Sequence, residues 1–305
     1  MQTLNHALDP ETLARIARLE LIARQAVEGF LAGKHPSPHH GSSVEYADHR
    51  PYALGDPIRT IDWKLLAKTD KYYIKLFEEQ TNLRATILLD ASRSMAFGEG
   101  SGTKFHQSCV LAAALAYLMI RQNDLVGLAL VDQEIRDYLP AGGKPSHFRR
   151  IVELMVATHP RGTTLLGSVI HLMAERMRRR GLVIIISDLL DEPGQIAEGL
   201  AHLRYRQHEA IVFHVVDPDE LTFPYERMTR FKDPEGASTV ITNPRMMRKR
   251  YLRRLDDHFD QVKRSCSACG VSYERVGTDG PCDRMLGTYL EKRARMRRTA
   301  GFHWR

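Results

Sequence analysis

The chain has 305 residues, of which 43% are hydrophobic and 27% are charged, a composition too apolar for a disordered protein. Its longest apolar run has 12 residues, from Cys109 to Ile120, which is too short for a membrane span, and acidic residues interrupt the first thirty positions. We therefore expect no membrane segment or signal peptide. The chain has 44 basic and 37 acidic residues. It has only four cysteines, so we expect a reduced, cytoplasmic protein.

The first segment, residues 1–41, is predicted to be an amphipathic helix followed by a loop. Asp9 and Pro10 are typical of a helix start, and apolar residues then recur every three to five positions until Gly33. The stretch from His35 to Gly41 contains two prolines and three histidines. We interpret it as an exposed loop rather than a metal site, because the prolines prevent regular structure.

The second segment, residues 42–83, is predicted to be a small β-rich unit. Aromatic and β-branched residues are scattered among turn residues such as Gly55-Asp56-Pro57. Residues 71–77 partly alternate between polar and apolar side chains, which predicts a strand.

The third segment, residues 84–298, alternates apolar strands with helices. This pattern predicts an α/β fold with a doubly wound, mostly parallel sheet that is covered on both faces. A β-hairpin is expected as an insertion at about 225–243. Strands are predicted at 85–90, 125–131, 135–139, 182–188, 210–216 and 271–276, and helices at 105–121, 147–157, 166–179, 195–206, 248–266 and 282–295.

Two of these strands end in carboxylates, at Asp90 and at Asp188. In a doubly wound sheet, ligands bind beyond the carboxyl ends of the strands, where the strand order reverses. If the order is Rossmann-like, the strands that carry Asp90 and Asp188 are neighbours at this point. The sequence therefore directs attention to this edge of the sheet.

Hydroxyl side chains accompany the first of these carboxylates. Asp90, Ser92 and Ser94 alternate in a tight loop, and Thr163 lies before a predicted helix. Carboxylate and hydroxyl oxygens without thiol or imidazole are ligands that suit Mg²⁺. Each segment alone is more typical of a helix cap than of a metal site, but their joint placement at one sheet edge reverses this preference.

These residues resemble the metal-ion-dependent adhesion site of von Willebrand factor A-like domains. The resemblance rests on three segments in the expected order: Asp90-Ala91-Ser92-Arg93-Ser94, Thr163 and Asp188. A second set of residues is similar to the bacterial family known as "domain of unknown function fifty-eight". It comprises Ser43-Val44-Glu45-Tyr46, Arg50-Pro51-Tyr52, Gly55-Asp56, Arg59, Ile61-Asp62-Trp63, Thr278-Asp279-Gly280-Pro281, Leu286 and Tyr289-Leu290.

The resemblance implies a binding module that is not an enzyme. Ser92, Ser94 and Thr163 would be metal ligands, and Asp90 and Asp188 would act directly or through water. The ion would be Mg²⁺, or another divalent cation such as Mn²⁺ or Ca²⁺, with one coordination position left for an Asp or Glu of a partner protein. The family also implies a MoxR-type AAA+ ATPase as partner, in a chaperone-like assembly. Many relatives carry membrane helices before the signature, whereas we find none in this chain.

Two other functions compete with this interpretation. A Mg²⁺-dependent phosphohydrolase would use Asp90 as nucleophile, but Ser92 occupies the position where haloacid-dehalogenase-like enzymes carry a second Asp. Neither a phosphate loop nor a nucleophile elbow is present. Non-specific nucleic-acid binding is the other alternative, because residues 245–305 hold 16 Lys or Arg and 7 Asp or Glu. Only Tyr251 interrupts the basic run as an aromatic, so we do not expect a nucleic-acid partner.

Two further motifs leave alternatives open. Cys266 and Cys269 have the spacing of a zinc or redox pair, with Cys282 further on, but we interpret them as incidental buried thiols. The segment from Gly55 to Trp63 is either a partner-facing surface or an Arg–Asp network with Trp63 as the anchor that joins the β-rich unit to the α/β domain. We favour the structural interpretation, because Trp contributes mostly through burial.

Overall fold

The chain forms two compact units, one of residues 34–82 and one that combines residues 1–33 with 83–305. The computed structural model describes residues 10–33, 46–53, 56, 58, 61–77, 83–232, 239–280 and 283–300. Among these residues, no helix combines the length and the apolar character needed to cross a bilayer.

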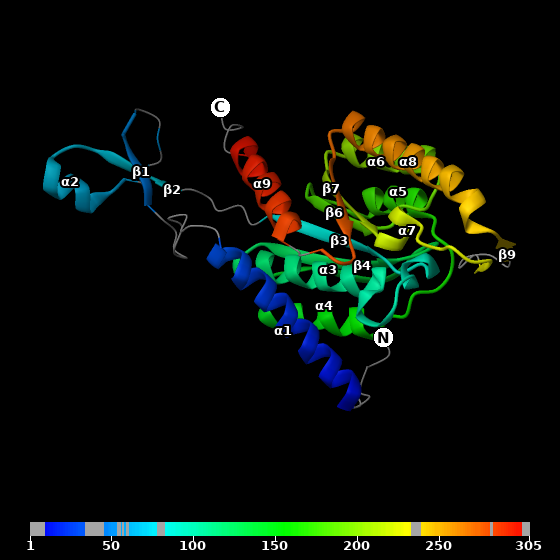
Figure 1. Cartoon of the computed structure of the whole chain (residues 1–305). Helices are drawn as coiled ribbons and strands as arrows, with labels where there is room; N and C mark the ends of the chain where they lie inside the picture. The colour runs from blue at the N-terminus through cyan, green and yellow to red at the C-terminus, as the bar shows by residue number, and fades with distance from the viewer. Residues whose placement is uncertain are drawn as a thin grey trace. The chain divides into compact units, whose positions relative to one another are not determined.

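The larger unit is built on a six-stranded sheet in the order β10-β7-β6-β3-β4-β5 (Figure 1). All neighbouring strands are parallel except β5, which runs antiparallel to β4. This confirms the predicted doubly wound, mostly parallel sheet, and the chain reverses its direction of strand addition at β3. The strands are β3 (Arg84–Asp90), β4 (Leu125–Val131), β5 (Ile135–Gly142), β6 (Leu182–Ser187), β7 (Glu209–Val216) and β10 (Ser272–Gly277).

Helices cover both faces of this sheet (Figure 1). Alternate side chains of a strand point to opposite faces, so Ile87 and Leu89 enter one core and Leu88 enters the other. Both faces are apolar, which explains the continuous apolar runs in the sequence. One face carries α1 (Pro10–Gly33), α3 (Lys104–Arg121), α4 (Pro145–Ala157) and α9 (Asp283–Ala300), and the other carries α5 (Leu166–Arg176), α6 (Pro193–Tyr205) and α8 (Pro244–Ala268).

Helix α3 is buried on nearly all sides because α1 and α4 pack on it from outside the sheet. The apolar stripe of α1, which includes Leu19 and Phe30, lies in the same core as α3. The sequence predicts α1 within a separate segment of residues 1–41, whereas the structure places this helix in the larger unit. The reason is that α1 buries the outer face of α3, which is also apolar.

The smaller unit pairs β1 (Tyr46–Pro51) with β2 (Tyr73–Phe77) and adds a short helix, α2 (Trp63–Thr69), that we do not predict from the sequence. Asp62 begins this helix, and its Oδ1 accepts hydrogen bonds from the backbone N–H groups of Lys64 and Leu65 at 3.0 and 3.1 Å. The side chain of Trp63 is 57% exposed, so it is not buried within the smaller unit, and its role as an anchor to the larger unit stays a prediction. Asp62 has a structural role, while Gly55 and Arg59 lie outside the described residues.

The segment between β7 and α8 holds α7 (Pro218–Thr222) and an antiparallel hairpin of β8 (Thr229–Lys232) and β9 (Thr239–Thr242). The hairpin confirms the insertion predicted at about 225–243. Helix α8 begins earlier than predicted, at Pro244, because Asn243 Oδ1 accepts from the backbone N–H of Arg245 at 3.1 Å.

Candidate functional site

The two predicted carboxylates lie on neighbouring strands at the same edge of the sheet. Asp90 ends β3, Asp188 directly follows β6, and these strands pair in parallel, which confirms the expected adjacency. Both side chains are almost fully buried, with 0% and 2% of their surface exposed. Two further carboxylates, Asp132 and Asp217, directly follow β4 and β7 at this edge. The sheet edge is therefore a concentration of buried negative charge.

The loop after β3 turns two serine hydroxyls toward each other. Asp90 Oδ1 accepts from the backbone N–H of Ser92 at 2.8 Å, and the Oγ atoms of Ser92 and Ser94 lie 3.0 Å apart. Both serines are buried. The loop is held by bonds from Ala91 N to the carbonyl of Val131 and from Arg93 N to that of Gly162. The structure thus brings Asp90, Ser92 and Ser94 together.

The loop before α5 approaches the same cluster. Gly162 adopts a φ of +75°, a backbone conformation that suits glycine, and this turn sets the direction of the two threonines that follow. The hydroxyl of Thr164 donates to Asp90 Oδ2 at 3.4 Å, whereas the hydroxyl of Thr163 accepts from the amide of Gln133. Among the hydrogen bonds of the described residues, Thr163 has none to Asp90. It lies one residue from a direct partner of Asp90 and is partly exposed.

Ser187, the last residue of β6, connects the two carboxylate loops. Its hydroxyl donates to Asp90 Oδ2 at 2.5 Å and accepts from the backbone N–H of Leu189 at 2.9 Å. Leu189 has a φ of 54°, a region that side-chain-bearing residues rarely occupy and that is frequent near functional sites. This tight turn positions Asp188, whose Oδ1 accepts from Leu190 N at 3.3 Å.

A buried lysine, which the sequence does not lead us to expect, neutralises Asp188. Lys104 is 1% exposed, and its Nζ donates to Asp188 Oδ2 at 2.7 Å and to Glu220 Oε1 at 2.8 Å. Burial alone lowers the pKa of Lys104, but the two carboxylates outweigh it and raise the pKa above its ordinary value. One signal was available: a lysine in the first turn of an apolar helix lies where the helix dipole disfavours a cation.

The charges of the cluster do not balance within the described residues. The ammonium of Lys104 pairs with the carboxylates of Asp188 and Glu220, and Asp188 in turn acts on the carboxyl group of Asp90. Burial, and then the charge of Asp188, raise the pKa of Asp90 to about 7 despite hydrogen bonds from Ser187 and Ser92. Burial lowers the pKa of His214 to about 3, so this neighbour adds no positive charge. With Asp90 protonated the cluster lacks one positive charge, and ionisation of Asp90 makes the shortfall two.

The donor set fits a divalent cation. Carboxylates and hydroxyls are the hard oxygen ligands that Mg²⁺ prefers. Adjacent ligands of an octahedron with bonds of about 2.1 Å are separated by about 3.0 Å, and the hydroxyls of Ser92 and Ser94 have that spacing. One divalent ion would also supply the two missing positive charges.

The other sequence motifs do not form comparable sites. Cys266 is buried and its pKa is raised to about 12 by burial, so its thiol is not activated, and Cys282 lies outside the described residues. No three His, Cys, Asp or Glu side chains gather as a metal site in the described part of the chain. The ring of Tyr251 packs against Phe223, with centroids 4.6 Å apart, rather than standing free to stack on bases.

Two curated mycobacterial proteins are similar to this chain in sequence over most of their length. The "Uncharacterized protein Rv1480" of Mycobacterium tuberculosis is 26% identical over 276 residues, which cover 89% of this chain and 86% of that protein. The "Uncharacterized protein Mb1516" of Mycobacterium bovis matches to the same extent.

Solved structures show the same architecture. The conserved hypothetical protein BatB from Bacteroides thetaiotaomicron covers 70% of this chain and 100% of its own, with a TM-score of 0.50 and 18% identity. An aerotolerance-related membrane protein from Bacteroides fragilis covers 69% and 100%, with a TM-score of 0.51 and 16% identity.

The larger unit has a von Willebrand factor A-like fold, as its mostly parallel sheet with helices on both faces indicates. The family described as "Protein of unknown function DUF58" matches residues 48–261, from the smaller unit through most of α8. Since this match spans more than half of the sequence, the chain belongs to that family.

Proposed function

We propose that this chain is a protein-binding module that holds a divalent cation, Mg²⁺ in first place, at the edge of its sheet. A partner protein supplies an Asp or Glu carboxylate to the remaining coordination position. The observation that carries this proposal is the buried, negatively charged cluster in which two serine hydroxyls lie 3.0 Å apart beside Asp90. The proposed ligands, direct or through water, are Asp90, Ser92, Ser94, Thr163 and Asp188.

The protein's own residues prepare this site before any partner arrives. Ser187 orients the carboxylate of Asp90, and Lys104 holds that of Asp188. The two hydroxyls are buried and close together, so little ordering remains to be done on binding. When bound, the cation supplies an electrophilic position for a carboxylate, which makes association depend on both the metal and an acidic side chain.

We further propose that the partner is a MoxR-type AAA+ ATPase, as the family resemblance implies, and that the module binds rather than catalyses. Ser92 supports a binding role over a catalytic one. It occupies the position where haloacid-dehalogenase-like phosphohydrolases carry their second Asp, and a serine there does not serve as the general acid or base. A phosphatase assay with a generic phosphomonoester and Mg²⁺ tests it, and turnover that Asp90→Ala abolishes would contradict the proposal.

Affinity capture from the native lysate tests partner binding. We expect wild type to retain an AAA+ ATPase in Mg²⁺ but not in EDTA, and folded Asp90→Ala to retain none in either buffer. The matched control is Asp137→Asn, which removes an exposed carboxylate from β5 of the same sheet and is expected to behave as wild type. Equal capture by wild type and Asp90→Ala in both buffers would overturn the proposed mechanism.

Cation binding is measured separately by calorimetry with MgCl₂, MnCl₂ or CaCl₂ alone. We expect wild type to bind one divalent ion and Asp90→Ala to bind none. The double variant Ser92→Ala, Ser94→Ala keeps both carboxylates and is expected to weaken binding at least tenfold. No heat of binding from wild type with any of the three ions would refute the cation site, whatever the capture experiment shows.

A further inference from the structure

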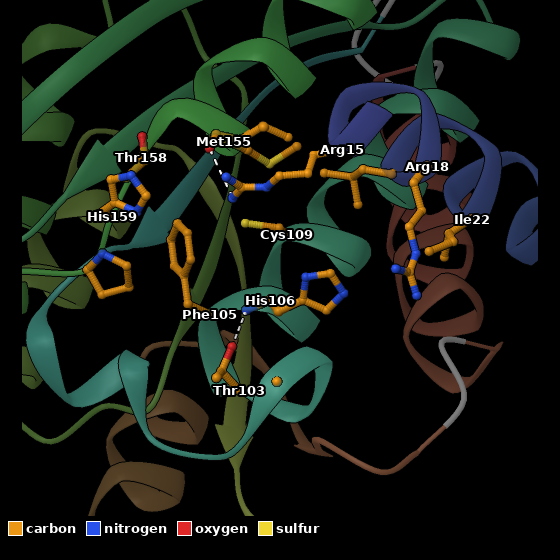
Figure 2. A pocket seen from close by; sticks show the side chains of 14 residues that line it. Arg15, Arg18, Ile22, Thr103, Phe105, His106, Cys109, Met155, Thr158 and His159 are labelled. Atoms are coloured by element: carbon orange, nitrogen blue, oxygen red, sulfur yellow. Dashed lines mark hydrogen bonds between the residues drawn. The ribbon is translucent and has the colours of Figure 1, made fainter. Parts of the chain in front are cut away.

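A pocket of about 370 Å³ lies between α1, the start of α3 and the end of α4, all in the larger unit (Figure 2). This volume is within the range of about 300–1,000 Å³ that is typical of small-molecule sites. Its floor is apolar and nearly fully buried, formed by Leu19, Phe105, Met155 and Val156. None of the lining residues belongs to the proposed cation ligands.

The charged side chains that line the pocket are all basic. Arg15 and Arg18 of α1 stand exposed at its mouth, and no Asp or Glu is among the described residues that line it. The guanidinium of Arg15 points across the mouth toward α4, above Cys109 (Figure 2). It has five N–H donors, and one of them bonds to the carbonyl of Val156 at 3.3 Å.

These arginines have no acidic partner within the protein's described residues. Neither forms an ion pair there, although Glu11 lies one helical turn before Arg15. His106 experiences the resulting positive potential: its pKa is lowered, first by burial and then by the charges of Arg18 and Arg15.

We propose that this pocket binds a small organic anion, a carboxylate or phosphate group carried on a short apolar chain. Arg15 and Arg18 would pair with the anionic group, since a guanidinium matches both groups in a two-pronged geometry. The apolar chain would cover Phe105 and Met155. The positive mouth excludes cationic ligands, and the apolar floor disfavours inorganic anions, which have nothing to bury there.

The pocket and the cation cluster are lined by residues that are close in sequence, but anion binding in the pocket does not depend on the cation. Thr158 to Pro160 lead directly into the loop that carries Thr163, and Thr103 precedes Lys104. The side chains of Lys104 and Phe105 then diverge, one to Asp188 and the other to the pocket floor. Anion binding should therefore survive in Asp90→Ala, which separates this inference from the proposed function.

Calorimetry with the full chain tests the proposal, with hexanoate and hexyl phosphate as probes. We expect at least one to bind at a single site, and the pair identifies which anionic group is preferred. Inorganic phosphate and hexylammonium are expected to bind at least tenfold more weakly than the better probe. Arg15→Gln and Arg18→Gln should each weaken that probe by about tenfold, and Arg24→Gln, on the same helix but over the ring of Tyr117, should change it less than twofold.

Three results would overturn the proposal. The first is that folded wild type binds neither hexanoate nor hexyl phosphate. The second is that hexylammonium or inorganic phosphate binds as tightly as the organic anions. The third is that the double variant Arg15→Gln, Arg18→Gln, with an unchanged circular dichroism spectrum, binds the better probe as wild type does.

Discussion

The cluster around Asp90 and the pocket at Arg15 hold charges of opposite sign at different depths. Asp90 and Asp188 are buried, so their negative charge must be compensated by groups that the fold brings to them. Arg15 and Arg18 are exposed to water and form no ion pair among the described residues. A buried uncompensated charge therefore affects both the free energy of unfolding and ligand affinity. An exposed charge affects ligand affinity alone. The following predictions test this difference, from the largest expected effect to the smallest.

The largest effect is expected from Lys104→Met, which keeps the length of the side chain but removes the only cation that contacts Asp188 in the described structure. Loss of one member of a buried charge pair is expected to lower the free energy of unfolding by about 3–5 kcal/mol. Urea unfolding in EDTA measures it. The control is Lys263→Met, at an exposed position on α8. A loss below about 1 kcal/mol would mean that water reaches the cluster and screens its charges, despite its low exposed fraction.

The next effect is a pH dependence that originates at Asp90. Its pKa is raised from 3.8 to about 7, so between these values the folded chain keeps a proton that the unfolded chain has lost. The free energy of unfolding therefore falls as the pH rises through this window. Unfolding of wild type and Asp90→Asn in EDTA, from pH 4 to 8, isolates this contribution.

The wild-type stability minus that of Asp90→Asn should decrease toward pH 7 in EDTA. Adding MgCl₂ should reduce the decrease, because a bound cation favours the ionised carboxylate. If the stability difference between wild type and Asp90→Asn did not change with pH in EDTA, the pKa of Asp90 would be at its ordinary value despite the burial of this residue.

A smaller loss is expected from Ser187→Ala, which removes the hydroxyl between Asp90 and Leu189. A buried acceptor left without its donor costs about 1–3 kcal/mol, measured again by urea unfolding. Ser265→Ala is the matched control, because this exposed hydroxyl bonds only to the carbonyl of Gln261 within its own helix. If the two serines gave equal losses, burial would not be what distinguishes the cluster.

The smallest effect is expected from Arg15→Gln and Arg18→Gln on folding, because both arginines are exposed and form no ion pair among the described residues. Each should change the free energy of unfolding by less than about 0.5 kcal/mol, even though each should weaken anion binding. A loss of 2 kcal/mol or more in thermal or urea unfolding would mean that the arginines hold α1 on the domain, and would remove the contrast between the two regions.

Much of the architecture follows from local pattern. Continuous apolar strands alternating with helices predict the covered parallel sheet, and the strand ends at Asp90 and Asp188 predict that these two carboxylates meet at one edge of it. Such predictions are possible because the alternation of apolar side chains and the residues that cap helices are set by neighbours within a few positions of the sequence. The same reasoning does not decide the environment of Trp63, because burial of a ring depends on what the rest of the chain places over it.

The partners of the site, by contrast, are separated by long stretches of chain. Lys104 reaches Asp188 across 84 positions and Glu220 across 116, and Ser187 reaches Asp90 across 97. No local pattern encodes these contacts, because they depend on the strand order that places β6 beside β3 and on the path of α7.

The sequence by itself thus determined the α/β class, the sheet edge and the oxygen-rich residues Asp90, Ser92, Ser94 and Asp188 that lie there. Only the tertiary structure decided that Lys104 shares Asp188 with Glu220, that Thr164 rather than Thr163 bonds to Asp90, and that α1 closes a basic pocket over α3. The physical reason is distance along the chain. Secondary structure arises from neighbours in sequence, whereas charge balance and cavities arise from segments that meet only after the sheet has assembled.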